Sequence, residues 1–242
     1  MSLDPHRNRK LRALVFGATG AIGTSISSKF ENDSWEVIRV CRNLPKPSEN
    51  FFVVFNPFVN EKAQTIDLTS VGKFDAVCWA QGKNATDNVY DVDIEENLEL
   101  YQANCLYILA SLKFLLSEQL LGPNARLCII SSIWQNIARQ NKLSYCMTKA
   151  ALQGLVQSAS IDLAKEGVMI NAILPGALET PMTRQNLAAD QLEKLSNGTF
   201  FNRLASLEDV SNLAVFLCSD KNTGITGQFI AADLGFSYAR LL

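Results

Sequence analysis

The chain has 242 residues, of which 48% are hydrophobic and 19% charged, and its formal net charge is −2. This length suits one α/β domain with a substantial core, while the small negative charge gives no basic surface for a nucleic-acid partner. No apolar run approaches the roughly 20 residues of a membrane span and no signal peptide is recognisable, so we expect a cytoplasmic protein without a membrane partner.

A polar segment, residues 1–10, is expected to be a flexible tail that precedes a single domain over residues 11–242. The only histidine, His6, lies in this tail, which removes His-based catalytic triads and His-rich metal sites from consideration. The six cysteines are scattered through apolar segments without a Cys-x-x-Cys pair, which favours buried free thiols over disulfides. No metal is therefore expected.

A glycine-rich turn follows the first predicted strand, residues 11–16, and precedes a predicted helix that ends near Phe30. Such a turn exposes backbone N–H groups at the positive end of a helix dipole, which suits the pyrophosphate of a dinucleotide. Gly17 permits the tight turn, Gly20 the close approach of a phosphate, and Gly23 the close packing of helix on strand. An ordinary strand-to-helix turn is the alternative.

The second predicted strand, residues 35–40, is not followed by an acidic residue. An NAD-specific site usually has an Asp or Glu at this point, where it accepts hydrogen bonds from the ribose hydroxyls. Arg42 instead offers a guanidinium that suits a 2′-phosphate, so the sequence favours NADP(H) over NAD(H). A solvated surface arginine is the alternative.

The middle of the chain is predicted to contain two more strands and a long helix. The third strand covers residues 51–55 and is followed by Asn56, and residues 75–82 form the fourth strand with its turn. Residues 95–121 are predicted to be helical and contain Asn104. An asparagine inside an apolar helix is costly unless its amide is hydrogen bonded, so Asn104 is expected to have specific partners.

A serine, a tyrosine and a lysine stand at spacings that suit one proton-transfer site. The apolar run of residues 126–132 is predicted to be a buried parallel strand ending at Ser132. Tyr145 follows 13 residues later, and Lys149 follows Tyr145 by four, so on a helix these two share one face. A nearby ammonium lowers the pKa of a phenol from about 10, which makes it a usable general acid or base. With the Ser132 hydroxyl as a second donor, this set suits the interconversion of a carbonyl and an alcohol.

The remaining segments complete the predicted sheet. In residues 133–142, four side chains are candidates for the wall of a substrate pocket, with a solvated loop or a subunit contact as the alternative: Trp134, Gln135, Asn136 and Arg139. Residues 167–176 form the sixth strand and its Pro-Gly turn. Residues 183–202 are predicted to be a mobile lid, and residues 225–235 contain the last strand.

These motifs resemble those of the classical short-chain dehydrogenase/reductase family, especially its 3-oxoacyl-carrier-protein-reductase-like members. Residues 171–182, Asn-Ala-Ile-Leu-Pro-Gly-Ala-Leu-Glu-Thr-Pro-Met, are similar to a further family motif. Two segments depart from the family pattern. Residues 17–23 have the spacing Gly-x-x-Gly-x-x-Gly in place of Gly-x-x-x-Gly-x-Gly, and residues 79–82, Trp-Ala-Gln-Gly, replace the family's Asn-Asn-Ala-Gly.

The resemblance implies a Rossmann-type α/β fold with a doubly wound, mainly parallel sheet of about seven strands. It implies four catalytic residues, namely Asn104, Ser132, Tyr145 and Lys149. It also assigns a cofactor site, which together with the residues argued above comprises Gly17, Thr19, Gly20, Ala21, Ile22, Gly23, Arg42, Asn56, Ala80, Gln81, Gly82, Tyr145, Lys149, Pro175, Gly176, Leu178 and Thr180. Members of this family commonly assemble as homotetramers or homodimers, which is the assembly expected here.

The sequence thus predicts an NADP(H)-dependent oxidoreductase that reduces a small ketone to a secondary alcohol. Tyr145 is the predicted general acid and Ser132 orients the substrate oxygen. Lys149 lowers the pKa of the tyrosine and bonds the nicotinamide ribose, and Asn104 positions a relay water, as the resemblance implies. Two alternatives remain: an NAD-dependent alcohol or sugar dehydrogenase, and a dinucleotide-binding regulatory protein without catalysis.

Overall fold

Seven strands form the centre of the molecule, which a computed structural model describes for residues 9–42, 52–58 and 68–238. The strands are β1 (Arg12–Phe16), β2 (Glu36–Cys41), β3 (Phe52–Val54), β4 (Phe74–Trp79), β5 (Leu121–Ile130), β6 (Met169–Pro175) and β7 (Phe229–Ala232). They pair in parallel in the order β3-β2-β1-β4-β5-β6-β7. The predicted Rossmann-type doubly wound sheet is therefore confirmed.

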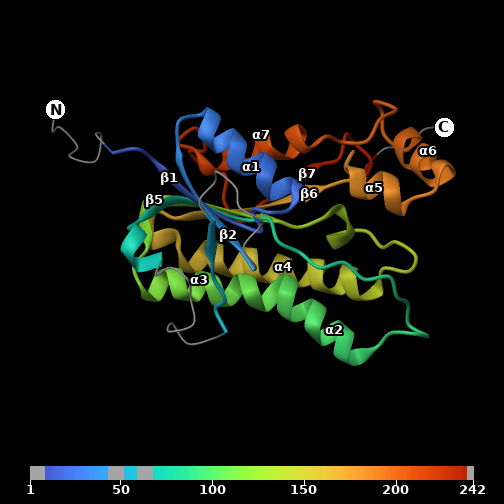
Figure 1. The fold of residues 1–242 in the computed structure, drawn as a ribbon, viewed down its shortest axis with the longest axis horizontal. Helices are drawn as coiled ribbons and strands as arrows, with labels where there is room; N and C mark the ends of the chain where they lie inside the picture. Colours follow the sequence, from blue (N-terminus) through green and yellow to red (C-terminus); the bar gives the residue numbers. More distant parts are fainter. Residues whose placement is uncertain (1–8, 43–51, 59–67, 239–242) are drawn as a thin grey trace.

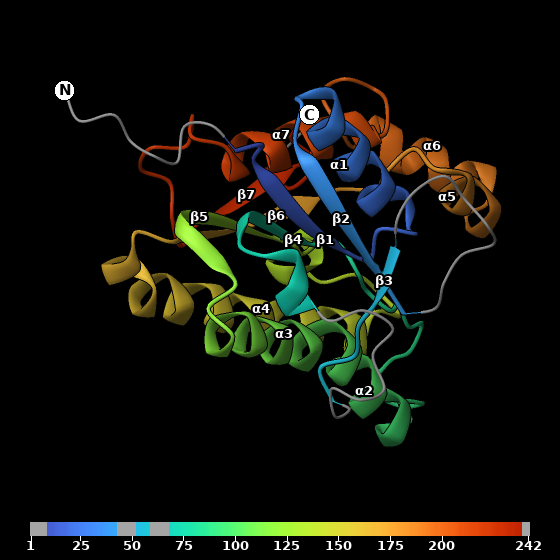
Figure 2. The same cartoon turned by 60° about the vertical axis from the view of Figure 1, so that its left-hand side comes forward.

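Helices cover both faces of the sheet (Figure 1 and Figure 2). They are α1 (Ala21–Asn32), α2 (Ile94–Tyr101), α3 (Tyr107–Ser117), α4 (Leu143–Asp162), α5 (Pro181–Asn186), α6 (Ala189–Asn197) and α7 (Leu207–Cys218). A π-helical turn, Gln102–Leu106, separates α2 from α3, and the described ranges contain 3₁₀ turns at Leu68–Val71, Ile133–Gln135 and Ala164–Glu166. One layer contains α1 and α7 and the other contains α3 and α4, while α5 and α6 follow the end of β6.

The strands are apolar along nearly their whole length because both faces of the sheet are covered. Residues 13–16 of β1 are fully buried. Phe16 at the end of β1 stacks on Trp79 at the end of β4, with ring centroids 5.7 Å apart, in the core between the sheet and the layer of α3 and α4. The strand order reverses between β1 and β4, so their carboxyl ends border the crevice where ligands bind in this fold class.

The predicted long helix over residues 95–121 is wrong at its end. The helical residues stop at Ser117, and Leu121 already belongs to β5, where it pairs with Phe74. The turn between them requires a left-handed residue, which is Gln119 with φ +52°. A short apolar run has no period that distinguishes the last turn of a helix from the start of a buried strand, which is why the boundary was misplaced.

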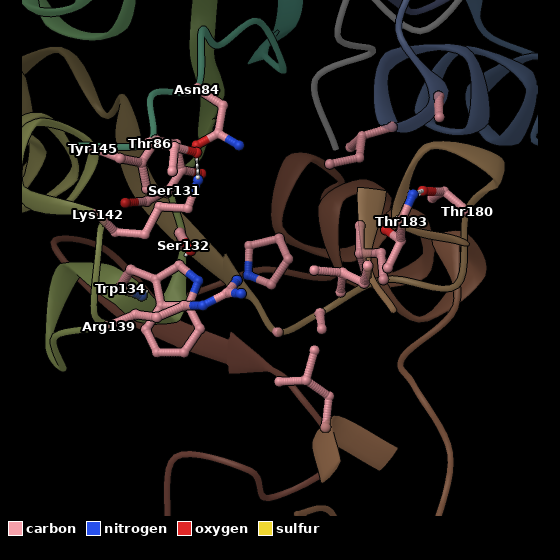
Figure 3. Close-up of a pocket in the computed structure, with 18 of the residues that line it drawn as sticks. Asn84, Thr86, Ser131, Ser132, Trp134, Arg139, Lys142, Tyr145, Thr180 and Thr183 are labelled. Carbon is pink, nitrogen blue, oxygen red and sulfur yellow. Dashed lines mark hydrogen bonds between the residues drawn. The ribbon is translucent and has the colours of Figure 1, made fainter. Parts of the chain in front are cut away.

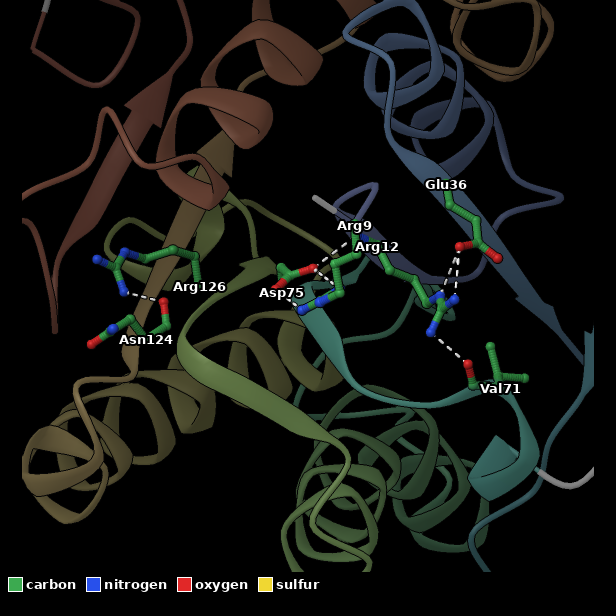
Figure 4. A network of polar contacts seen from close by, with 7 residues as sticks. All are labelled: Arg9, Arg12, Glu36, Val71, Asp75, Asn124 and Arg126. Carbon is green, nitrogen blue, oxygen red and sulfur yellow. Dashed lines mark hydrogen bonds and ion pairs between the residues drawn. The ribbon is translucent and has the colours of Figure 1, made fainter. Parts of the chain in front are cut away.

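Charged side chains join the amino-terminal ends of the central strands (Figure 4). The carboxylate of Asp75 accepts hydrogen bonds from the guanidinium of Arg9 and, at 2.9 Å, from the backbone N–H of Arg12. The Arg12 side chain donates to Glu36 at 2.9 Å and to the carbonyl of Val71. These contacts link β1, β2 and β4 at the end of the sheet away from the crevice.

Several further expectations concern segments or groups away from the crevice. Residues 1–8 of the predicted tail and Phe51 of the predicted third strand lie outside the described residues. All six cysteines are free and five are buried, as predicted.

No helix in the described ranges is long and apolar enough to cross a membrane. Within the same ranges, no cluster of His, Cys, Asp or Glu has the arrangement of a metal site.

Candidate active site

Ser132 stands directly beyond the carboxyl end of β5, as the sequence predicts. The backbone is still extended there, and the serine caps the 3₁₀ turn that follows, because its Oγ accepts a hydrogen bond of 3.3 Å from the backbone N–H of Trp134. The hydroxyl of its neighbour Ser131 donates to Oε1 of Gln135 at 2.8 Å. Ser132 is 6% exposed, so its hydroxyl is held in a nearly dry position.

Tyr145 and Lys149 lie one turn apart on α4, and the helix places both beside the end of β5. The Nζ of Lys149 donates to the carbonyl of Ile130 at 3.0 Å and lies 5.6 Å from the centroid of the Tyr145 ring. Lys149 is only 4% exposed. Its burial lowers its pKa to about 8, so the ammonium gives up its proton close to physiological pH.

The net pKa of Tyr145 is raised, which corrects the prediction of a lowered value. Burial of the phenol is the main cause, and a hydrogen bond from Ser132 acts in the opposite direction without overcoming it. The lysine ammonium is held by the carbonyl of Ile130 rather than by the phenol oxygen. Tyr145 is therefore a neutral phenol at pH 7, the form that donates a proton.

Asn104 occupies the π-helical turn between α2 and α3 and has the specific partners that were predicted. Its Oδ1 accepts from the backbone N–H of Lys83 at 2.7 Å, and its Nδ2 donates at 3.0 Å to both the Lys83 carbonyl and the Thr148 hydroxyl. A Cβ built on Gly82 would lie 3.6 Å from Asn104 Oδ1 and 3.7 Å from Lys149 Nζ. The amide thus joins the segment after β4 to α4 next to the lysine.

The glycine turn has the shape expected of a phosphate cradle. Gly17 has φ +71°, and a Cβ built on Gly23 would lie 2.3 Å from the Gly17 carbonyl oxygen, so both positions require glycine. By contrast, a Cβ built on Gly20 would meet only one atom, at 3.4 Å, so the space above this residue is open. No side chain caps the N-terminus of α1, and its first turn has no acidic residue. These features fit the pyrophosphate of a nicotinamide dinucleotide.

The departure from the family's Asn-Asn-Ala-Gly motif has a packing explanation. Trp79, at the position of the first asparagine, points into the core and donates from its Nε1 to the Ser111 hydroxyl at 2.8 Å. Gln81 behaves differently, because both polar atoms of its amide are buried without a hydrogen-bond partner in the described ranges. A buried amide without a partner, beside the glycine turn, is suited to hydrogen bond with a polar group of a bound cofactor.

A cavity of about 1100 Å³ lies beside these groups. It brings together predicted residues from five segments: Gly20, Ala21, Ile22, Ala80, Ser132, Tyr145, Pro175, Gly176, Leu178 and Thr180. Figure 3 shows Ser132 and Tyr145 on one side of it and Thr180 on the other. The hydroxyl of Thr180 also caps α5, accepting from the backbone N–H of Thr183 at 3.1 Å.

Some predicted residues lie outside this cavity lining. Asn104, Lys149 and Gly82 lie next to one another behind the lining, and Lys149 lies beside the lining residue Tyr145. Gly17 and Gly23 are packed within the glycine turn, and the backbone of Gln81 lies against Gly17. Three others are exposed at the carboxyl ends of β1, β2 and β3, namely Thr19, Arg42 and Asn56.

The four candidates for the substrate wall divide into two pairs. Trp134 and Arg139 line the cavity. Gln135 does not, because it is 7% exposed and bonded to Ser131, and Asn136 next to it is also outside the lining. A 3₁₀ turn sends successive side chains in different directions, so neighbours in sequence separate in space.

Several lining residues were not anticipated. The Nζ of Lys142 donates to Asn84 Oδ1, the Ala85 carbonyl and Thr86 Oγ1 at 3.0, 2.7 and 3.1 Å, which fixes the segment after β4 against the start of α4. No sequence pattern indicates this tertiary contact. The predicted lid contains most of α5 and all of α6, and α6 contributes Gln191 and Leu195, whose spacing of four residues is typical of one helix face.

Known proteins share both sequence and fold with this chain. The family model described as "Enoyl-(Acyl carrier protein) reductase" matches residues 60–237. The "Uncharacterized oxidoreductase YmfI" of Bacillus subtilis is 27% identical over 240 residues, which cover 93% of this chain and 98% of the relative. The 3-oxoacyl-(acyl-carrier-protein) reductase FabG of Buchnera aphidicola is 24% identical over 243 residues, covering 95% and 98%. The ligand-free aldohexose dehydrogenase (AldT) of Thermoplasma acidophilum has the same fold, with a TM-score of 0.85 at 19% identity over 97% and 96% of the two chains.

Proposed function

Because the chain belongs to the short-chain dehydrogenase/reductase family and is an NAD(P)-dependent oxidoreductase, we propose that it reduces the ketone of a small molecule to a secondary alcohol with NADP(H). One observation carries the proposal: Tyr145 lies beside Ser132 at the end of β5, and both side chains line the cavity. A phenol that stays protonated at neutral pH is a general acid, which a carbonyl oxygen needs as it becomes a hydroxyl.

The proposed catalytic residues have separate tasks. Ser132 donates a hydrogen bond that fixes the substrate oxygen, and Tyr145 gives that oxygen its phenolic proton. Lys149, cationic below about pH 8, stabilises the phenolate that remains. Asn104 is a positioning residue, since its amide holds the segment after β4 against α4. When bound, a nicotinamide supplies the hydride for the carbonyl carbon.

Three segments are proposed to hold the cofactor. Residues 17–23 cradle the pyrophosphate with the N–H groups at the start of α1, a role supported by the open space above Gly20. Residues 80–82 contact the ribose, where the unpartnered amide of Gln81 offers a donor and an acceptor. Residues 175–180 bind the nicotinamide end.

We also propose a homodimer or homotetramer, for which β7, a half-buried strand at the edge of the sheet, is the expected contact.

Arg42→Ala is expected to weaken NADPH binding roughly 10- to 100-fold and to leave NADH binding unchanged, because an exposed guanidinium after β2 contacts only the 2′-phosphate. Paired fluorescence titrations with NADPH and NADH measure both affinities. Lys165→Ala removes an exposed cation far from the crevice and serves as the matched control. Tighter binding of NADH than of NADPH by the unaltered protein would contradict the proposed preference.

The proposed activity is tested by following NADPH oxidation with a panel of simple ketones, and NADP⁺ or NAD⁺ reduction with the matching alcohols. Turnover of ketones with NADPH supports the proposal. Turnover confined to NAD⁺ and alcohols or sugars favours an oxidative dehydrogenase. Tight dinucleotide binding without turnover of any compound favours a regulatory protein.

A further inference from the structure

The described part of the cavity wall carries two positive charges and no carboxylate. Among the described residues that line it, Arg139 and Lys142 are the charged ones. Burial is the main cause of the lowered pKa of Lys142 and the charge of Arg139 adds to it, whereas the carboxylate of Asp87, which is outside the lining, acts in the opposite direction. A pocket with cations alone repels cationic ligands and attracts anionic ones.

The ammonium of Lys142 already has hydrogen-bond partners within the protein. Its ammonium has three oxygen partners within 3.1 Å, from Asn84, Ala85 and Thr86. An ammonium has three N–H donors, so these contacts satisfy all of them. Lys142 therefore serves to hold the segment after β4, and the charge that remains for a ligand belongs to Arg139.

The guanidinium of Arg139 has no ion-pair partner in the part of the chain that the structure describes. It lies over the indole of Trp134, 5.9 Å from the ring centroid. Trp134 is itself held by the ring of Phe236, edge to face at 6.2 Å. A cation–π contact of this kind holds the guanidinium beside the indole and leaves its N–H donors available for an oxyanion.

Arg139 lies on the substrate side of the cavity. Figure 3 shows its side chain crossing Trp134 on the side of Ser132 and Tyr145, across from Thr180 and Thr183. Thr180, at the end of the proposed nicotinamide segment, is thus across the cavity from Arg139. A molecule that contacts both the catalytic hydroxyls and Arg139 is therefore the substrate, and its anionic group lies at Arg139.

We propose that Arg139 binds an anionic group of the substrate, so that the pocket takes ketones that also carry a carboxylate or a phosphate. The guanidinium fork forms two parallel hydrogen bonds with either group, and its partial burial strengthens them. The position of the carbonyl in this substrate class rests on the proposed function, whereas the binding of the anion does not.

The test is calorimetric titration of the protein saturated with oxidised NADP⁺, a state in which ketones bind without being reduced. One set of probes comprises methyl ketones with a terminal carboxylate at increasing distance, 3-oxobutanoate, 4-oxopentanoate and 5-oxohexanoate, each beside its methyl ester. A second pair is dihydroxyacetone phosphate and dihydroxyacetone, which separates phosphate from carboxylate as the source of the anion.

The best anionic probe is expected to bind roughly 10- to 100-fold more tightly than its neutral partner. Arg139→Gln removes this preference, Arg139→Lys retains part of it, and Lys165→Gln leaves it intact. Equal binding of the two members of every pair, no binding of any anionic probe, or a preference that survives Arg139→Gln overturns the proposal. Weaker NADP⁺ binding by Arg139→Gln with an intact anion preference also overturns it, because Arg139 then belongs to the cofactor site.

The two proposals fail in different ways. Reduction of neutral ketones that depends on Tyr145, without any anion preference, keeps the reductase and removes the role of Arg139. An Arg139-dependent anion preference without turnover of any ketone keeps the anion site and removes the reductase.

Discussion

Tyr145→Phe is expected to lower kcat for ketone reduction by roughly 10²- to 10⁴-fold, the usual contribution of a positioned general acid. The substitution removes one oxygen from a side chain whose ring remains packed on α4, so the fold and the cofactor site are retained. NADPH affinity is therefore expected to stay within about twofold of the original value, because the phenol proton is used in the chemical step. Steady-state kinetics and a fluorescence titration measure the two quantities.

Tyr90→Phe is the matched control, because that phenol is 96% exposed and far from the proton-transfer residues in the sequence. It is expected to leave both quantities unchanged. Undiminished turnover by Tyr145→Phe would show that another group protonates the substrate oxygen. Loss of cofactor binding together with turnover would assign Tyr145 to binding rather than to proton transfer.

Lys149→Met is expected to abolish most ketone reduction and yet to stabilise the folded protein at pH 7 by about 1–3 kcal/mol. Burial lowers the pKa of Lys149 from 10.5 to about 8. At pH 7 the lysine is protonated in both states, but the proton is bound less favourably in the folded protein than in the unfolded chain, and this difference destabilises the fold. Methionine has a similar length and no charge to bury. The lost hydrogen bond to the Ile130 carbonyl offsets part of the gain.

The sign of the pH dependence follows from the same shift. Between about pH 8 and pH 10.5 the unfolded chain binds more protons than the folded protein at this position, so the stability of the original protein rises with pH there. Lys149→Met lacks this rise. Denaturant unfolding at pH 7 and pH 9.5 measures the difference between the two proteins, and a gap that stays constant or widens with pH would contradict the account.

Activity responds to pH in the opposite direction. Above about pH 8 Lys149 becomes neutral and no longer stabilises the phenolate of Tyr145, so kcat/KM for reduction is expected to fall. The residual activity of Lys149→Met is expected to lack that inflection. A profile with the same inflection in both proteins would assign the titration to another group.

The predictable parts of the fold are those that a pattern of neighbouring residues in the sequence specifies. Continuous apolar runs indicated strands that are buried on both faces, and the turn between Gly17 and Gly23 indicated the junction of β1 with α1. The spacing of Ser132, Tyr145 and Lys149 placed these residues on one strand end and one helix face, where the structure has them. In each case the pattern lies within one element or one turn.

The parts that were missed depend on contacts between distant segments. The raised pKa of Tyr145 follows from burial, which residue spacing does not express. Lys142 reaches residues 84–86 across more than fifty positions of sequence. Gln135 and Trp134 are adjacent in the chain, yet only Trp134 faces the cavity, because the 3₁₀ turn between β5 and α4 directs them apart. Such features are set by tertiary packing.

The central claim is that the protein transfers a hydride to a ketone in a reaction that requires Tyr145. The most direct measurement uses NADPH that carries deuterium at both C4 positions of the nicotinamide, with mass spectrometry of the alcohol formed. The account predicts one deuterium on the carbinol carbon with the original protein. With Tyr145→Phe it predicts that labelled product forms roughly 10²- to 10⁴-fold more slowly. Alcohol that forms without deuterium, or labelled product at equal rates from both proteins, would contradict it.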